Sequence, residues 1–191
     1  MNPGEFRPFL RTLALESGKV IAPYFADPTL SVDTKSDASP VTVADRNAEE
    51  FLRGEIRKAY PAHGIIGEEF GNEREGAEFV WVLDPIDGTK SFISGCPLFG
   101  TLIALLYQGK PVLGAIHQPV LGQLCLGDGV TTTLNDKPVR VRNTAELSAA
   151  TLLYTERKMI GTHQNLAAFE KLEARCNLVR TWGDCYGYLL L

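Results

Sequence analysis

The sequence lacks several features that would place a protein in a specialised class. No stretch approaches the roughly 20 apolar residues of a membrane span, and the first residues are not a basic segment followed by an apolar one. The four cysteines form no C-x-x-C pair, which argues against a zinc knuckle or a thioredoxin-like site. The net charge is −4, so the chain has no basic excess for nucleic acid or an anionic membrane. These absences predict a cytoplasmic protein with reduced thiols and with neither a nucleic-acid nor a membrane partner.

Internal repeats and low-complexity tracts are absent as well. Ser91 and Ser94 lack the Gly-x-Ser-x-Gly setting of a serine hydrolase. What is present is an ordinary globular composition, with 45% hydrophobic and 22% charged residues among 191. That length suits one domain, or one domain and part of a second.

The spacing of apolar residues changes along the chain. Helical spacing predicts two helices near the start, over 5–25 and 42–60. Strand signals then predict a largely antiparallel sheet, with strands at 65–66, 79–83, 101–107, 112–117, 123–126 and 139–141. A strand over 151–154, a helix over 165–175, a strand over 178–181 and a helix from Cys185 predict a second α/β unit. We therefore expect an α+β domain over 1–145 and the start of an α/β domain over 146–191.

The last residues are unusually apolar. The sequence finishes on Leu189-Leu190-Leu191, within a helical pattern that carries no C-cap signal. We therefore expect the sequence to be a piece of a longer protein.

The strongest chemical signal is the hexapeptide Asp84–Thr89. We expect a hydrophobic strand to end at Asp84, with Pro85 stiffening the turn after it. Asp87 follows three residues after Asp84, so two carboxylates can face one point, where their repulsion is costly unless a cation neutralises it. Hard ions such as Mg²⁺ take carboxylate and carbonyl oxygens, so the Ile86 carbonyl is a further candidate ligand. The lack of nearby His and Cys favours Mg²⁺ over zinc.

Further acids and backbone amides can join this hexapeptide. Glu68 follows a short strand in Gly67-Glu68-Glu69, and Asp45 lies near the start of the second helix. The amides of Gly88 and Thr89 are candidates for binding an anion at a helix N-terminus. Each feature alone has a structural explanation: a turn for Asp-Pro-x-Asp-Gly, a solvated surface for Glu68, and the helix dipole for Asp45. Together they indicate phosphate chemistry.

These residues, in this order, resemble the motifs of the inositol monophosphatase superfamily of Mg²⁺-dependent, lithium-sensitive phosphatases. That family has an Asp in its second helix, then Gly-Glu-Glu, then Asp-Pro-Ile/Leu-Asp-Gly-Thr, matched here by Asp45, Gly67–Glu69 and Asp84–Thr89. The resemblance covers essentially the whole chain, and it implies a layered α-β-α-β-α sandwich of the α+β or α/β class and a homodimer. The family's later Trp-Asp and Gly-Gly segment is missing, so the second domain is expected to be incomplete.

Two stretches are most similar to the histidinol-phosphate phosphatase branch of this superfamily, residues 89–106 and 180–188. In the second stretch, Gly183-Asp184 stands where inositol phosphatases usually have Gly-Ser. A carboxylate there suits the ammonium group of histidinol phosphate, so Gly183, Asp184 and the nearby Arg180 are candidate substrate-binding residues. The alternatives are a helix N-cap for Asp184 and an exposed strand end for Arg180.

The resemblance also implies a ligand set for two or three Mg²⁺ ions. Glu68, Asp84 and the Ile86 carbonyl would hold the first ion. Asp84 and Asp87 would hold the second, together with the Asp of the missing segment. Because losing one ligand weakens a metal site strongly, the activity of this chain by itself is an open question.

The expected catalytic residues are Glu68, Asp45 and Thr89. In the family, the last two orient and deprotonate a water that attacks phosphorus in line, without a phosphoenzyme. Lys35 is expected near the active site, with an ordinary solvated lysine as the alternative. The expected substrate contacts are Lys35, Ile86, Asp87, Gly88, Thr89, Arg180, Gly183 and Asp184.

We therefore expect a Mg²⁺-dependent phosphate monoester hydrolase. Its expected reaction is dephosphorylation of L-histidinol phosphate to L-histidinol in histidine biosynthesis. One alternative is an inositol monophosphatase or a broad sugar-phosphate phosphatase. The alternative from another class is an inactive fragment that serves only as a folding or association module.

Overall fold

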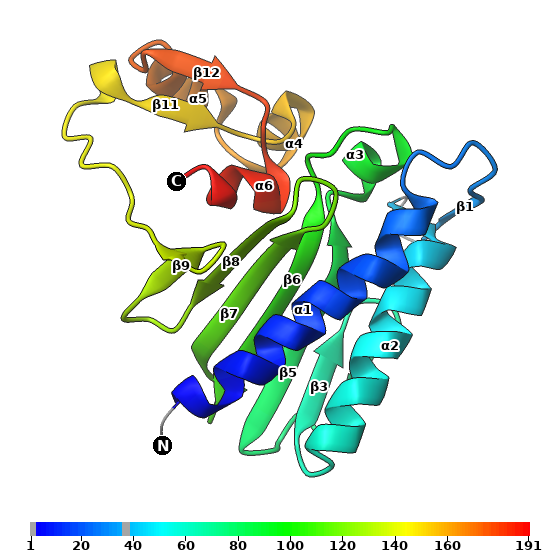
Figure 1. Cartoon of the computed structure of the whole chain (residues 1–191). Coiled ribbons are helices and arrows are strands. Elements are labelled where there is room, and N and C mark those ends of the chain that lie inside the picture. Colours follow the sequence, from blue (N-terminus) through cyan, green and yellow to red (C-terminus); the bar gives the residue numbers. More distant parts are fainter. Residues whose placement is uncertain (1–2, 36–38) are drawn as a thin grey trace. The chain divides into compact units, whose positions relative to one another are not determined.

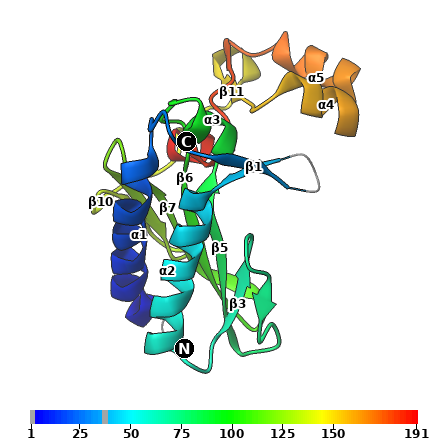
Figure 2. The same cartoon turned by 90° about the vertical axis from the view of Figure 1, so that its right-hand side faces the viewer.

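The computed structural model describes residues 3–35 and 39–191, and its contacts divide the chain into two compact units, Met1–Val139 and Arg140–Leu191 (Figure 1). In the first unit, two long helices lie side by side on one face of an eight-stranded sheet (Figures 1 and 2). They are α1 (Arg7–Ile21) and α2 (Val43–Ala59), and they confirm the two helices that the apolar spacing predicts. None of the helices in the described ranges combines the length and the apolar composition of a membrane span.

The sheet is antiparallel except at one pair. Its order is β10-β9-β8-β7-β6-β5-β3-β4, and only β3 and β5 run parallel. The strands are β3 (Gly64–Gly67), β4 (Asn72–Glu73), β5 (Phe79–Asp87), β6 (Gly100–Tyr107), β7 (Lys110–Gln118), β8 (Gln123–Gly127), β9 (Thr132–Leu134) and β10 (Lys137–Pro138). The short elements around the helices are η1 (Pro3–Phe6), η2 (Ala22–Tyr24), and the paired strands β1 (Val32–Thr34) and β2 (Pro40–Thr42).

The main core lies between the two helices and the sheet. Leu10 and Leu13 of α1 and Leu52 of α2 are buried there against Trp81 and Leu105 of the sheet. Because side chains alternate along a strand, the same strands can bury one face under the helices and leave the other half-buried. Burying one such large apolar side chain stabilises the fold by roughly 1.5–3 kcal/mol. This packing fixes α2 against β3 and β5, whose carboxyl ends carry the acidic motifs.

The expected strand over 139–141 is wrong. The chain instead turns at Asn135 and Asp136, which both have positive φ angles of 49° and 63°, and so forms the β9–β10 hairpin. The second strand of that hairpin ends at Pro138, which has no backbone N–H for further pairing. The Val139 amide donates one last hydrogen bond to the Thr132 carbonyl, at 2.9 Å.

The expected strand end at Asp84 is also wrong. Strand β5 continues through Pro85 as far as Asp87, and its pairing with β6 shifts register between Asp84 and Asp87. A bulge of this kind accommodates proline because one residue of the bulged strand is left out of the ladder. Both acids therefore belong to one irregular strand rather than to a strand and a turn.

The second unit is an α/β arrangement, as the alternating pattern predicts. Strands β11 (Thr151–Leu153) and β12 (Leu178–Arg180) pair in parallel, and the connection between them contains two helices. The apolar pattern did not predict the first of these helices, which is short and has Ile160 as its one buried residue. The compact units divide at 139/140, whereas the expected domain division at 145/146 stays a prediction. The remaining elements are η3 (Leu147–Ala149), α4 (Arg157–His163), α5 (Leu166–Glu173) and α6 (Asp184–Leu189).

His117 is a buried polar residue between α1 and the sheet. Its side chain is 4% exposed, and the ring donates a hydrogen bond to the Ala14 carbonyl. Its Nδ1 atom has no partner among the described residues. Gly18 packs so closely on the ring that a Cβ there would overlap it. Burial lowers the pKa of His117 because the ring cannot be charged without losing its hydration.

Lowering the pH should therefore destabilise this unit through His117. Below about pH 6.5 the unfolded chain binds a proton that the folded ring resists, so the free energy of unfolding falls with pH by at most about 1.4 kcal/mol per unit. Urea unfolding at pH 7.5 and 5.5 measures this slope. His117→Gln should reduce it, and His163→Gln, at an exposed position of α4, should not. Equal slopes in parent and His117→Gln would contradict the assignment.

Candidate metal centre

The hexapeptide is held in place by hydroxyl groups. Thr101 of β6, which is fully buried, donates a hydrogen bond of 2.8 Å from its Oγ1 to the Pro85 carbonyl. The Thr89 Oγ1 donates one of 3.0 Å to the Ile86 carbonyl. Gly88 then takes a left-handed conformation with φ 86°, and the short helix α3 (Thr89–Ile93) follows. The bulge and this turn direct the strand end into the helix, as Figure 1 shows for β5 and α3.

The pKa of Asp84 lies far above its ordinary value. Its Oδ1 atom is buried and finds no hydrogen-bond partner in the described part of the chain. Burial, followed by repulsion from Glu68 and Asp87, raises the pKa of Asp84 to about 9. Its carboxyl group is also hydrogen-bonded to that of Glu68. Two acids in contact and a third nearby are unfavourable without a positive charge.

Lys35 supplies a positive charge at the edge of this cluster. Its Nζ atom lies 2.6 Å from Glu68 Oε1 and 2.6 Å from Glu69 Oε1. Burial alone would lower the pKa of Lys35, but its hydrogen bonds to the two glutamates raise it. Burial raises the pKa of Glu69, whose side chain is 6% exposed, while Lys35 opposes that shift. Lys35 is therefore not an isolated surface lysine.

Asp45 has a structural partner as well as a place near the acids. Its Oδ2 atom accepts hydrogen bonds from the Thr42 amide at 2.8 Å and the Thr42 hydroxyl at 2.6 Å. The Thr42 hydroxyl in turn accepts from the Ala44 amide, which completes a capping box at the start of α2. Burial raises the pKa of Asp45 against these hydrogen bonds, and the charge of Glu68 adds to the rise. The carboxylate is thus held rigidly within electrostatic reach of Glu68.

The donor set of this cluster fits a hard divalent cation. Asp84 offers a buried oxygen that has no partner among the described residues. The surrounding candidate ligands are carboxylate and carbonyl oxygens rather than sulfur or imidazole. Across residues 3–35 and 39–191, no group of three or more His, Cys, Asp or Glu side chains is already spaced to hold a metal ion. Lys35 holds Glu68 and Glu69 instead, so a cation would have to compete with its ammonium group.

The remaining candidates belong to the second unit. Gly183 is the N-cap of α6 and Asp184 its first residue, without a side-chain capping bond, so the N-cap alternative for Asp184 is wrong. Asp184 has a positive φ of 52°, and its carboxylate accepts a 3.1 Å hydrogen bond from the Thr155 hydroxyl. Asp184, Thr155 and Tyr188 line a cavity of about 420 Å³. A carboxylate at a cavity wall is placed to bind a cationic group.

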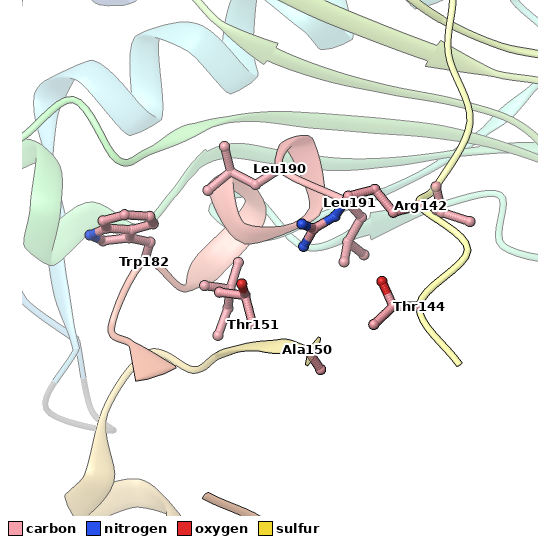
Figure 3. A pocket seen from close by; sticks show the side chains of 9 residues that line it. Arg142, Thr144, Ala150, Thr151, Trp182, Leu190 and Leu191 are labelled. Atoms are coloured by element: carbon pink, nitrogen blue, oxygen red, sulfur yellow. The ribbon is translucent and has the colours of Figure 1, made fainter. Parts of the chain in front are cut away.

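Arg180 is exposed at the end of β12, as its structural alternative predicts. Its guanidinium lies 5.8 Å from the centre of the Trp182 ring, and its Nη1 donates to the Val179 carbonyl at 2.7 Å. Trp182 also lines a second cavity of about 540 Å³ with Leu190 and Leu191 (Figure 3). Nothing in these contacts directs Arg180 toward a phosphate.

The structure thus groups the sequence candidates by unit. Lys35, Asp45, Glu68 and Asp84 interact with one another in the first unit, and Asp184 lies in the second. Sequence reasoning missed Glu69 as a partner of Lys35 and Thr155 as a partner of Asp184. It also missed two buried charged residues of α2, Glu49 and Arg53. Their signal was available: charges four residues apart, starting from Asp45, along the buried side of an amphipathic helix.

Comparison with known proteins identifies the family. The sequence matches the model of the Inositol monophosphatase family over residues 2–190. The chain belongs to the inositol monophosphatase family. This places it among phosphomonoesterases and confirms the resemblance carried by Asp45, Gly67–Glu69 and Asp84–Thr89. Enzymes of this family are generally Mg²⁺-dependent.

Two relatives and one solved structure show how much of the family the chain represents. It is 43% identical over 180 residues to a histidinol-phosphatase of Chlorobaculum parvum, covering 94% of this chain and 70% of that protein. It is 46% identical over 182 residues to the bifunctional phosphatase IMPL2, chloroplastic, of Arabidopsis thaliana. That match covers 94% of this chain and 52% of that protein. An inositol monophosphatase structure from Zymomonas mobilis matches with a TM-score of 0.86 and 38% identity. That match covers 100% of this chain and 74% of the Zymomonas mobilis chain. The expected fold is thereby confirmed, and the chain spans between half and three quarters of these proteins.

Proposed function

We propose that this chain carries the metal site of a Mg²⁺-dependent phosphatase that converts L-histidinol phosphate to L-histidinol and inorganic phosphate. One observation carries the metal part of this proposal. The Oδ1 atom of Asp84 is buried without a hydrogen-bond partner among the described residues. Glu68 and Asp87 repel this carboxyl group, and a bound divalent cation would relieve that repulsion. The likeness to the histidinol-phosphatase of Chlorobaculum parvum supports the substrate.

The residues that would hold Mg²⁺ are those of the expected ligand set. Glu68, Asp84 and the Ile86 carbonyl would hold one ion, and Asp84 and Asp87 a second. When bound, the metal would supply charge neutralisation at the phosphate and a water of lowered pKa. The Ile86 carbonyl accepts from Thr89 and has a second lone pair for a further partner.

The chain's own groups would orient the reactants. Thr89, at the start of α3, would position the attacking water through its hydroxyl, while Asp45 would accept a proton on its carboxylate. The raised pKa of Asp45, which comes first from burial, suits a group that takes up a proton. The amides of Gly88 and Thr89 would contact phosphoryl oxygens, so much of the catalysis would be positioning. Lys35 would release Glu68 as the cation binds.

The substrate is distinguished by the group beyond the phosphate. Histidinol phosphate carries an ammonium group, and Asp184 presents a carboxylate at a cavity wall of the second unit. A second candidate is an inositol or sugar phosphate, which the Zymomonas mobilis inositol monophosphatase structure favours. The roles of Gly183 and Arg180 in substrate binding, a homodimer, a place in histidine biosynthesis and a cytoplasmic location stay predictions.

Phosphate release should be faster from histidinol phosphate than from inositol 1-phosphate. The assay uses the 191-residue chain with Mg²⁺ and, as a blank, the same chain with excess chelator. Preference for histidinol phosphate, lost with the chelator, is the expected result. Faster release from inositol 1-phosphate would favour the second candidate. Release from neither substrate would favour the inactive folding or association module.

A further inference from the structure

Helix α2 carries a line of buried charges that the proposed chemistry does not use in full. Asp45, Glu49 and Arg53 follow one another at intervals of four residues, so they share one side of the helix. They are 3%, 0% and 2% exposed. Asp45 lies beside the acidic cluster, but Glu49 and Arg53 lie one and two turns farther along. Burying an ion pair rarely stabilises a fold more than apolar residues would, so this pair calls for another explanation.

Glu49 holds the loop that carries two acids of the cluster. Its Oε2 atom accepts a 2.7 Å hydrogen bond from the Glu69 amide, and its Oε1 atom accepts one of 3.2 Å from the Phe70 amide. The same Oε1 accepts a 2.7 Å hydrogen bond from Arg53 Nε. A buried helical carboxylate therefore fixes the backbone directly after Glu68.

Arg53 holds the other end of this loop. Its Nη2 atom donates to the Gly71 carbonyl, and its Nη1 donates to Glu73 Oε1 at 2.8 Å. The Gly71 carbonyl also accepts from the Gly67 amide at 3.3 Å, which closes the loop on itself. Through Glu49 and Arg53, α2 thus contacts both sides of the segment Gly67–Gly71.

Gly67 shows how close this approach is. A Cβ at this position would overlap the Glu49 carboxylate and the Arg53 guanidinium. The pair therefore touches the backbone at the residue immediately before Glu68. Because Asp45 and this pair belong to one rigid helix, the distance between Asp45 and the Glu68–Glu69 loop is fixed as well.

We propose that Glu49 and Arg53 are positioning residues, which hold the Gly67–Gly71 loop so that Glu68 faces Asp84. Residues that orient metal ligands typically change metal affinity by 10- to 100-fold when they are replaced. The inference rests on the proposed function, because it assigns the buried pair a role in a Mg²⁺ site.

Two variants test the pair, and both are read out by Mg²⁺ binding in calorimetry rather than by activity. Glu49→Gln keeps the size of the side chain and removes its charge. The double variant Glu49→Leu with Arg53→Met removes both charges, so no unpaired buried charge remains to unfold the chain. Ile56→Ala, a buried position of the same helix outside this loop, controls for lost stability. The expected result is a Mg²⁺ dissociation constant raised at least tenfold in both variants and unchanged in Ile56→Ala.

Amide hydrogen exchange at Glu69 and Phe70 provides the second readout. It should speed up in both variants while the core strands stay protected. Variants that bind Mg²⁺ as the parent does would overturn the inference, whatever their stability. A parent that binds no Mg²⁺ would instead overturn the proposed function, and the exchange rates alone would then decide whether the pair holds the loop. If the exchange rate instead rises equally at amides throughout the chain, the pair stabilises the fold as a whole and does not position the loop.

Discussion

Replacing Asp84 with asparagine should abolish both Mg²⁺-dependent phosphate release and stabilisation of the chain by Mg²⁺. The parent should gain about 2.7 kcal/mol of unfolding free energy at a Mg²⁺ concentration 100 times its dissociation constant. That gain corresponds to a rise of roughly 5–11 °C in the unfolding temperature. The variant should show no such rise, because its neutral amide cannot become the carboxylate whose buried Oδ1 atom has no partner among the described residues of the parent. Thermal unfolding with and without Mg²⁺ measures the difference.

Without Mg²⁺ the same variant should be at least as stable as the parent. Asparagine has the size of aspartate and is not repelled by Glu68 and Asp87. Functional sites commonly trade stability for activity in this way. Asp136→Asn is the matched control, because it removes a carboxylate whose ion pair with Arg11 is exposed. If Asp84→Asn responds to Mg²⁺ like Asp136→Asn, then Asp84 does not hold the metal.

Much of the first unit could be predicted because its signals are local in the sequence. The helix α2 begins at the Thr42–Asp45 box and ends just before Pro61, and both signals lie within a few residues of the boundary. The core strands alternate between buried residues such as Trp81 and half-buried ones such as Val82. The hexapeptide could be found for the same reason, since its acids are neighbours in the chain.

The sequence could not predict contacts that join distant segments. Arg53 meets Gly71 and Glu73 across 18 and 20 residues, and Lys35 meets Glu68 across 33. Nothing in a local pattern specifies which loop a helical charge will contact. The continuation of β5 through Pro85 was missed for a related reason. The Pro85 carbonyl is bound by Thr101 of the next strand, which lies 16 residues away.

Replacing Asp184 with asparagine should alter the choice of substrate. Hydrogen bonds to charged groups contribute about 1.5–3 kcal/mol, so kcat/KM for histidinol phosphate should fall roughly 10- to 150-fold. Inositol 1-phosphate has no ammonium group, and its kcat/KM should change little. Steady-state phosphate release from both substrates measures the two values. Their ratio, rather than either value, reports on recognition of the ammonium group.

Asparagine is chosen because of the backbone at this position. The φ of Asp184 is 52°, a left-handed conformation that asparagine also adopts but most other residues resist. Its side-chain oxygen can still accept the hydrogen bond from Thr155, so the start of α6 should keep its shape. Glu170→Gln, which removes an exposed carboxylate of the second unit that pairs with Arg157, is the matched control. Equal losses on both substrates in Asp184→Asn would show that the carboxylate maintains local structure and does not select the substrate.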